Sequence, residues 1–195
     1  MTSTDMSPAD RYRELAATFT RRVDVVPEDR WDSKSSCDGW TARDVIRHVI
    51  DSQRDMVKVV GLEFDAGPSV DDDPAAAWAA LRDSMQRVLD DPAQATLEYD
   101  GHFGRTDLAA TVGRFICLDL VVHGWDVAEA TGTDTTISEA DLEWVGGVAE
   151  SLGDSIRMAG VCGPQIPVAE DADQQTRVLA YLGRRNRQDP HSARK

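Results

Sequence analysis

The sequence predicts an all-α protein in which four long helices form a bundle. Apolar residues recur at intervals of three and four along four separate segments, which is the spacing of helices with one buried face. A capping box and several prolines indicate where these helices begin and end. At 195 residues the chain is long enough to bury one core, and it shows no internal repeat or interdomain linker.

The first helix follows Pro8 and ends before Pro27, with a buried face formed by Tyr12, Leu15, Ala16, Phe19 and Val23. The second helix runs from Thr41 to about Val60. Its first residues, TARD, predict a capping box in which Thr41 and Asp44 each accept a hydrogen bond from the other's backbone amide.

The third helix begins at Pro74, after the loop GLEFDAGPSVDDDP, and ends near Asp91. The segment TLEYDGHFGRTDL alternates in polarity around Asp100 and Gly101, so we expect a short hairpin there. The fourth and longest helix is expected over 106–131.

A fifth helix is indicated by the spacing of Leu142, Val145, Ala149, Leu152 and Ile156. The loop MAGVCGPQIPVAEDAD follows, and QQTRVLAYLGRR predicts a last short helix packed outside the bundle. We therefore expect one domain over residues 1–183. Residues 184–195 are expected to form a disordered basic tail.

The composition limits the class of partner. The net charge is −14, although the tail from Arg184 onward holds five basic residues and one acidic residue. Such a charge repels nucleic acid and anionic membranes, so we expect neither as a partner. The three cysteines, Cys37, Cys117 and Cys162, are widely spaced and odd in number, and no basic, apolar leader or membrane-length apolar run is evident. The expected location is the cytoplasm.

Two polar residues interrupt the apolar face of the fourth helix. Asp119 and His123 are one helical turn apart, and Asp126 falls within the same arc. The apolar members of this face are Leu108, Val112, Phe115, Ile116, Val122, Val127 and Ala130. A buried carboxylate needs a compensating charge or hydrogen bonds, and a divalent metal ion would supply that charge.

A third ligand must come from another helix, and His48 is the other histidine expected within a long helix. Two histidines and one carboxylate leave coordination positions open to water or substrate, as in catalytic zinc sites and in the iron facial triad. The expected ion is zinc, with nickel or iron as alternatives. Asp126 is expected to orient a ligand rather than to bind the ion.

A non-metal interpretation also fits the pattern. Asp119 and His123 can form a buried pair that bonds to each other or to Arg43 or Arg47. His102, in the hairpin, is expected to be exposed rather than a fourth ligand, and His191 lies in the tail.

Three segments, CDGWTARDVIRHVID, LDLVVHGWDVAEATG and QTRVLAYLGRR, resemble the actinobacterial DinB-like metal-binding proteins related to mycothiol-dependent maleylpyruvate isomerase. The resemblance spans nearly the whole chain. It implies a four-helix up-down-down-up bundle that binds zinc or another divalent ion through His48, Asp119 and His123.

The leading hypothesis is a thiol-dependent transferase or isomerase, in which the ion activates the thiol of mycothiol for an electrophilic substrate. The hairpin and the loop 61–73 are then expected to line the mouth of the site. Trp40 and Trp125 either wall a pocket or, more simply, pack in the core. One alternative is a non-catalytic metal or small-molecule binding protein, and another is a metal-dependent hydrolase with Asp126 or His102 as base. An exposed fifth helix makes a homodimer a further expectation.

Overall fold

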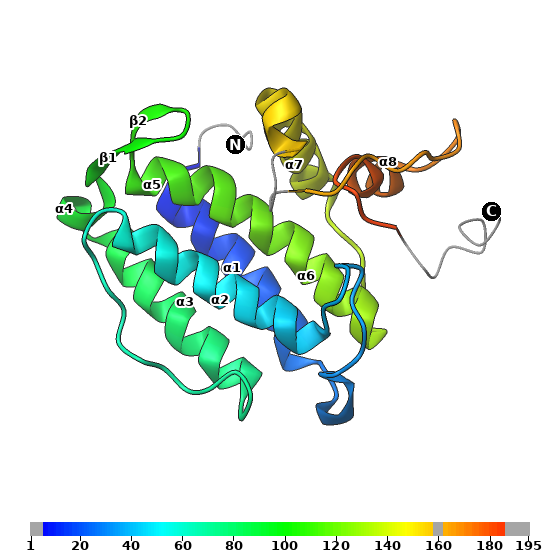
Figure 1. The fold of residues 1–195 in the computed structure, drawn as a ribbon, viewed down its shortest axis with the longest axis horizontal. Helices are drawn as coiled ribbons and strands as arrows, with labels where there is room; N and C mark the ends of the chain where they lie inside the picture. The colour runs from blue at the N-terminus through cyan, green and yellow to red at the C-terminus, as the bar shows by residue number, and fades with distance from the viewer. Residues whose placement is uncertain (1–5, 158–161, 186–195) are drawn as a thin grey trace.

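The computed structural model describes residues 6–157 and 162–185 and is mostly helical, with one small antiparallel sheet (Figure 1). The prediction of a helical fold class is confirmed at this level. Helix α1 packs against α3 and α6, and α2 packs against the same two helices. The long helices are α1 (Pro8–Asp24), α2 (Ala42–Lys58), α3 (Pro74–Asp90) and α6 (Cys117–Thr131).

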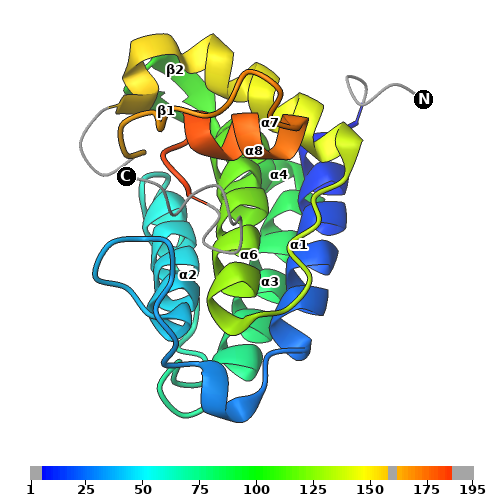
Figure 2. The same cartoon turned by 90° about the vertical axis from the view of Figure 1, so that its right-hand side faces the viewer.

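The direction of the long helices follows from one long connection. Residues 59–73 return the chain along the length of the helices, so α2 and α3 run in the same direction (Figures 1 and 2). Helices α1 and α6 run the opposite way. Helix α2 is therefore antiparallel to α6, its neighbour on one side.

Local signals fix where the helices begin. The side chain of Ser7 caps α1, and Thr41 and Asp44 form the predicted capping box at the start of α2. The side chain of Asp73 caps α3 next to Pro74. These three starts agree with the sequence prediction to within a residue or two.

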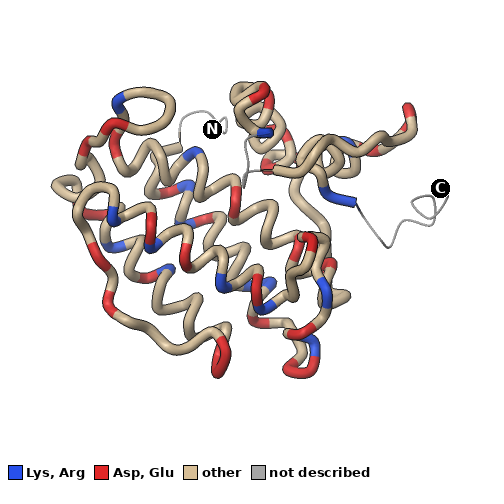
Figure 3. Tube along the Cα trace, viewed as in Figure 1, with Lys and Arg blue, Asp and Glu red and all other residues tan. Residues whose placement is uncertain are grey.

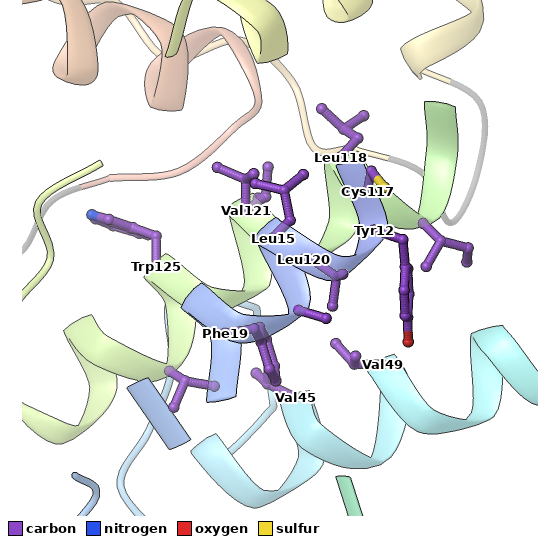
Figure 4. Close-up of a cluster of buried hydrophobic side chains, with 14 of the residues drawn as sticks. Tyr12, Leu15, Phe19, Val45, Val49, Cys117, Leu118, Leu120, Val121 and Trp125 are labelled. Carbon is purple, nitrogen blue, oxygen red and sulfur yellow. The ribbon is translucent and has the colours of Figure 1, made fainter. Parts of the chain in front are cut away.

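The core lies between the long helices. Figure 4 shows Tyr12 and Phe19 of α1 close to Val45 and Val49 of α2 and to residues of α6. The hydroxyl of Tyr12 donates a 2.8 Å hydrogen bond to Oε1 of Gln53, and both side chains are fully buried. This bond links α1 to α2 inside an otherwise apolar interior.

The predicted hairpin is present. After the short helix α4 (Pro92–Ala95), strand β1 (Glu98–Gly101) pairs with β2 (Gly104–Asp107) across a two-residue turn. The fourth predicted helix therefore begins at Leu108, and its expected start at 106 is wrong because residues 106 and 107 pair with β1 instead. From there α5 (Leu108–Thr111) passes through a π-helical turn, η3 (Val112–Ile116), into α6.

Helix α7 (Glu139–Leu152) contacts α6 and α8 (Gln174–Tyr181) at one side of the long helices (Figure 2). The predicted fifth helix extended to Ile156, but α7 ends at Leu152, because the next residue, Gly153, has a φ of +52° that breaks the helix. Ile156 lies instead in the short helix η4 (Gly153–Arg157). A further short helix, η2 (Glu28–Arg30), joins α1 to the segment before α2.

The helical stretch Leu108–Thr131 is long and apolar enough to cross a membrane, but 67% of its most apolar window is buried inside the structure. Such a stretch is typical of a central core helix, so it gives only weak support for a membrane span. Lys and Arg residues are interspersed with Asp and Glu along the described chain (Figure 3).

The prediction that the disordered tail begins at Arg184 is wrong. Arg184, which the sequence assigns to a disordered tail, is 9% exposed and hydrogen-bonded. Its guanidinium pairs with a buried carboxylate of α6, so the folded chain extends past residue 183. Residues 186–195, the rest of the predicted tail, lie outside the described residues.

Candidate metal centre

The three predicted ligands lie together between α2 and α6. His48 comes from α2, and Asp119 and His123 come from α6. One potential ligand atom from each residue lies within 4.8 Å of the others. The centroids of the His48 and His123 rings are 4.9 Å apart, with the ring planes at 73°. The structure therefore brings two imidazoles and one carboxylate to a single point.

Burial around this point is uneven. Asp119 is the one residue of α6 that is not buried, on a helix that is otherwise covered on all sides. The sequence placed Asp119 at the centre of a buried stripe, whereas it is partly exposed where α6 faces α2. His48 is also partly exposed, and His123 is 6% exposed. Solvent thus reaches the cluster from the side of Asp119 and His48.

Asp126 lies behind His123 and is fully buried. His123 Nδ1 lies 2.9 Å from Oδ2 of Asp126, and Arg184 donates to the same oxygen at 3.2 Å. The hydroxyl of Ser36 donates to Oδ1, and the thiol of Cys37 lies 3.4 Å from Oδ2. Since an ionised carboxylate only accepts, His123 carries its proton on Nδ1, which leaves Nε2 as the nitrogen that Asp126 does not engage.

These contacts shift the pKa values of the group. Burial alone would raise the pKa of Asp126, but the charge of Arg184 and the hydrogen bonds from His123 and Ser36 hold it well below its usual range. Burial would lower the pKa of His123, and its hydrogen bond to Asp126 raises it instead. Burial and the neighbouring His123 lower the pKa of His48. The lowered pKa favours the neutral form of His48, which is the form that binds a metal ion, whereas an ion has to displace a proton from His123.

A second group of possible ligands, Cys37, His123 and Asp126, overlaps the first. In this group the carboxylate is already engaged by hydrogen bonds and by the ion pair with Arg184. In contrast, the side chains of His48 and Asp119 have no hydrogen bond within the described part of the chain. The donor set of His48, Asp119 and His123 is therefore the one that is free to bind an ion.

Aromatic packing differs between the two candidate tryptophans. The ring of Trp40 lies 4.9 Å from that of His48 and 6.4 Å from that of His123, so it packs beside the cluster. Trp125 is fully buried in the core, which supports its simpler packing role.

The arginine that supports the site is not one that the sequence suggested. Arg43 binds Asp32 and backbone carbonyls of the loop before α3, and Arg47 pairs with Asp44 and Asp71. Arg184 instead pairs with Asp126, the carboxylate behind His123. One feature of the sequence could have pointed to Arg184: it lies in QTRVLAYLGRR, one of the three segments that carry the family resemblance.

Cys37 and Ser36 were also missed as partners of Asp126. Both precede the capping box in a turn-rich segment without helical periodicity. His102 lies in the hairpin turn and is exposed, as expected.

The fold and the cluster define a mostly helical protein with two histidines and a carboxylate set between two central helices. The chain belongs to the family described as the mycothiol maleylpyruvate isomerase N-terminal domain, whose sequence model matches residues 12–128. The matched span includes His48, Asp119, His123 and Asp126. Arg184 and helices α7 and α8 lie beyond it.

Two relatives are uncharacterized proteins of Mycobacterium tuberculosis, one from strain H37Rv and one from strain CDC 1551. Each is 23% identical over 189 residues, covering 92% of this chain and 98% of the relative. No solved structure matches the chain.

Proposed function

We propose that His48, Asp119 and His123 hold one divalent metal ion, and that the protein is a transferase or isomerase that uses the thiol of mycothiol. The observation that carries the proposal is the approach of three ligand atoms, from two helices, to within 4.8 Å of one another. Membership of a mycothiol-related family supports the choice of thiol.

The donor set fits such an ion. Two ligands that each lie about 2.1 Å from one ion are at most about 4.2 Å apart, so the observed span needs only small side-chain rotations to close. Two imidazoles and one carboxylate suit zinc, and nickel or iron accept the same ligand types. Three protein ligands also leave coordination positions open, which a catalytic centre requires and a structural zinc site does not.

The surrounding residues prepare the ligands. Asp126 fixes the orientation of the His123 ring through Nδ1, and Arg184 compensates the charge of Asp126. Trp40 packs against His48 and limits the space around the two imidazoles. The partly exposed Asp119 marks the side from which a small thiol enters.

When bound, an ion of this kind lowers the pKa of a thiol, so that a thiolate is present at neutral pH to attack an electrophile. The chain's own part is to hold the ligands, to keep His48 neutral and to leave the Asp119 side open. The proposed partners are thus a low-molecular-weight thiol and an electrophilic small molecule.

We propose the DinB-like four-helix bundle as the frame of this site, on the basis of the paired contacts and directions of α1, α2, α3 and α6. A cytoplasmic location and a homodimer formed through α7 stay predictions.

The test is elemental analysis of protein purified without an affinity tag or chelator, followed by calorimetric titration of mycothiol into the loaded protein. We expect one ion per chain and thiol binding that is lost in His123→Ala and His48→Ala. The matched control is His102→Ala, which removes an exposed histidine of the hairpin turn and should keep both properties.

The other outcomes contradict the proposal in different ways. One ion per chain without thiol binding would reject the thiol-dependent function and favour a metal-dependent hydrolase or a binding protein. No ion after reconstitution with zinc, nickel or iron would reject the metal centre and leave Asp119 and His123 as a polar pair of the helix interface.

A further inference from the structure

A cavity of 530 Å³ lies against the β1–β2 hairpin, apart from the histidine cluster. Its walls come from the hairpin, the end of α2, the turn formed by α5 and η3, and the end of α7 with η4. Its apolar lining includes Met56, Val59, Phe103, Phe115 and Leu152. A volume of this size is typical of small-molecule sites, which span about 300–1,000 Å³. The sequence predicts the hairpin and the loop 61–73 at the mouth of the metal site; the hairpin lines this separate cavity, and the loop 61–73 does not.

Two aromatic rings form one wall of the cavity. The ring centroids of Phe103 and Phe115 are 5.7 Å apart, and their planes differ by 13°. Phe103 is 55% exposed, although it is a large apolar side chain at the centre of the hairpin turn. A flat apolar ligand placed against these rings removes their surface from water, which is favourable, and offset stacking adds to the gain.

Arg114 brings a positive charge to the same wall. Its guanidinium lies 5.5 Å from the centroid of the Phe115 ring and donates a 2.8 Å hydrogen bond to the hydroxyl of Ser151. Arg114 forms no salt bridge within the described part of the chain, whereas the nearby Arg105 pairs with Glu98 at 2.8 Å. On a protein with a net charge of −14, an arginine without a carboxylate partner beside an apolar cavity is suited to an anionic group of a ligand.

The cavity lies along the same two helices as the histidine cluster. Phe115 precedes Asp119 by four residues, which corresponds to about 6 Å along a helix. Met56 follows His48 by eight residues, or about 12 Å, on the facing helix. Helix α2 packs against both α6 and the turn η3. Phe115 and Met56, which line the cavity, therefore lie about one and two helical turns along the chain from the candidate ligands on their helices.

We propose that this cavity binds a small aromatic molecule that carries an anionic group. The aromatic part lies against Phe103 and Phe115, and the anionic group pairs with Arg114. Binding in the cavity does not depend on the metal ion. The further role of the occupant, as the electrophilic substrate of the thiol reaction, rests on the proposed function.

Two fluorescent probes separate the apolar and charged parts of this site. Anilinonaphthalene sulfonate carries aromatic rings and an anionic group, and N-phenylnaphthylamine carries similar rings without charge. Ala110 lines the cavity and is exposed, so Ala110→Trp fills the cavity without disturbing the core. The matched control is Ala93→Trp, at an exposed position of α4 outside the cavity.

We expect one molecule of either probe to bind per chain. Ala110→Trp should weaken both probes by about tenfold or more, and Ala93→Trp should weaken neither. Arg114→Gln should weaken the anionic probe by about fivefold or more and leave the neutral probe within about twofold. Circular dichroism confirms that each variant is folded.

Equal binding by Ala110→Trp and Ala93→Trp would overturn the cavity proposal. Equal effects of Arg114→Gln on the two probes would overturn the assignment of the anionic group to Arg114. Zinc content, measured on the same samples, keeps the two proposals distinct. Probe binding by a wild-type chain that takes up no zinc would reject the metal centre alone, and a zinc-loaded chain without probe binding would reject the cavity alone.

Discussion

His123 and Asp126 are joined inside α6 by a 2.9 Å hydrogen bond between Nδ1 of the imidazole and Oδ2 of the carboxylate. The two residues are three apart in sequence, and at most 6% of either is exposed. A carboxylate behind a ligand imidazole fixes both the tautomer and the orientation of the ring. The position of Nε2 of His123 is thus fixed before an ion binds.

Asp126→Asn tests this preorganisation. An amide cannot accept fully from both His123 and Arg184, so the ring loses its fixed orientation and the arginine loses its counter-charge. We expect zinc affinity to fall by about 10- to 100-fold, with one ion still bound at saturation. Calorimetric titration of zinc measures the change. Asp55→Asn, an exposed aspartate of α2, is the control, and an equal affinity for both variants would contradict the role of Asp126.

Arg184→Met tests whether the segment after α8 is part of the folded domain. Removing the guanidinium leaves the fully buried carboxylate of Asp126 without its cationic partner. Because hydrogen bonds from Ser36 and Cys37 remain, we expect a loss of about 3 kcal/mol in the free energy of unfolding, the low end for a broken buried pair. Urea unfolding of the metal-free protein measures it.

The exposed Arg87, which donates a hydrogen bond to Ser84 on its own helix, provides the control substitution Arg87→Met. In the double variant Asp126→Asn/Arg184→Met, the free energy of unfolding should fall by less than the sum of the two single losses. Both charges are then absent, so no buried charge is left without its partner. A change of less than about 0.5 kcal/mol in Arg184→Met would mean that the pair contributes nothing to folding.

The features that the sequence could predict are those encoded by residues close together in the chain. The capping box of Thr41 and Asp44, the prolines at helix starts and the four-residue spacing of Asp119 and His123 are local, and the structure contains each of them. The start of the fourth helix depends on strand pairing with residues ahead of it, so helical periodicity alone placed it two residues early.

The support of the site depends on contacts distant in sequence. Ser36 lies 90 residues before Asp126, and Arg184 lies 58 residues after it. No spacing rule connects such positions, and a run of basic residues at the end of a chain is typical of a solvated tail. The candidate ligands could therefore be proposed from one helix and a capping motif, whereas the residues that contact Asp126 could not.

Tyr12→Phe tests the polar link between α1 and α2. The substitution keeps the ring and removes the hydroxyl that donates to Gln53 at 2.8 Å, leaving a buried amide oxygen without that donor. We expect the free energy of unfolding to fall by about 1–3 kcal/mol. In Tyr12→Phe/Gln53→Leu much of this loss should be recovered, since no orphaned acceptor remains. Urea unfolding compares the variants, with the partly exposed Tyr181→Phe as control. A Tyr12→Phe protein as stable as this control would mean that the bond contributes no net stability.

The capping box at the start of α2 should make the free energy of unfolding depend on pH, through the carboxyl group of Asp44. Hydrogen bonds from the backbone and hydroxyl of Thr41, and then the charge of Arg47, lower the pKa of Asp44. A carboxyl whose pKa is lower in the folded state stabilises the fold above its unfolded pKa, near 3.9, and this stabilisation is lost as the pH falls through the folded value. At about pH 7, Asp44→Asn should reduce the free energy of unfolding by about 0.5–1 kcal/mol.

This difference between wild type and Asp44→Asn should shrink from about pH 5 downward and approach zero once Asp44 is protonated in both states. Urea unfolding with chelator present measures it at each pH, so that loss of metal in acid does not contribute. Asp72→Asn, in the loop before α3, removes an exposed carboxylate and should show little difference at any pH. A wild-type advantage that stays constant down to about pH 3 would mean that the cap does not depend on the charge of Asp44. Because His48 lies four residues further along α2, zinc affinity at neutral pH, measured on the same variant, shows whether fraying of this helix end reaches the ligand.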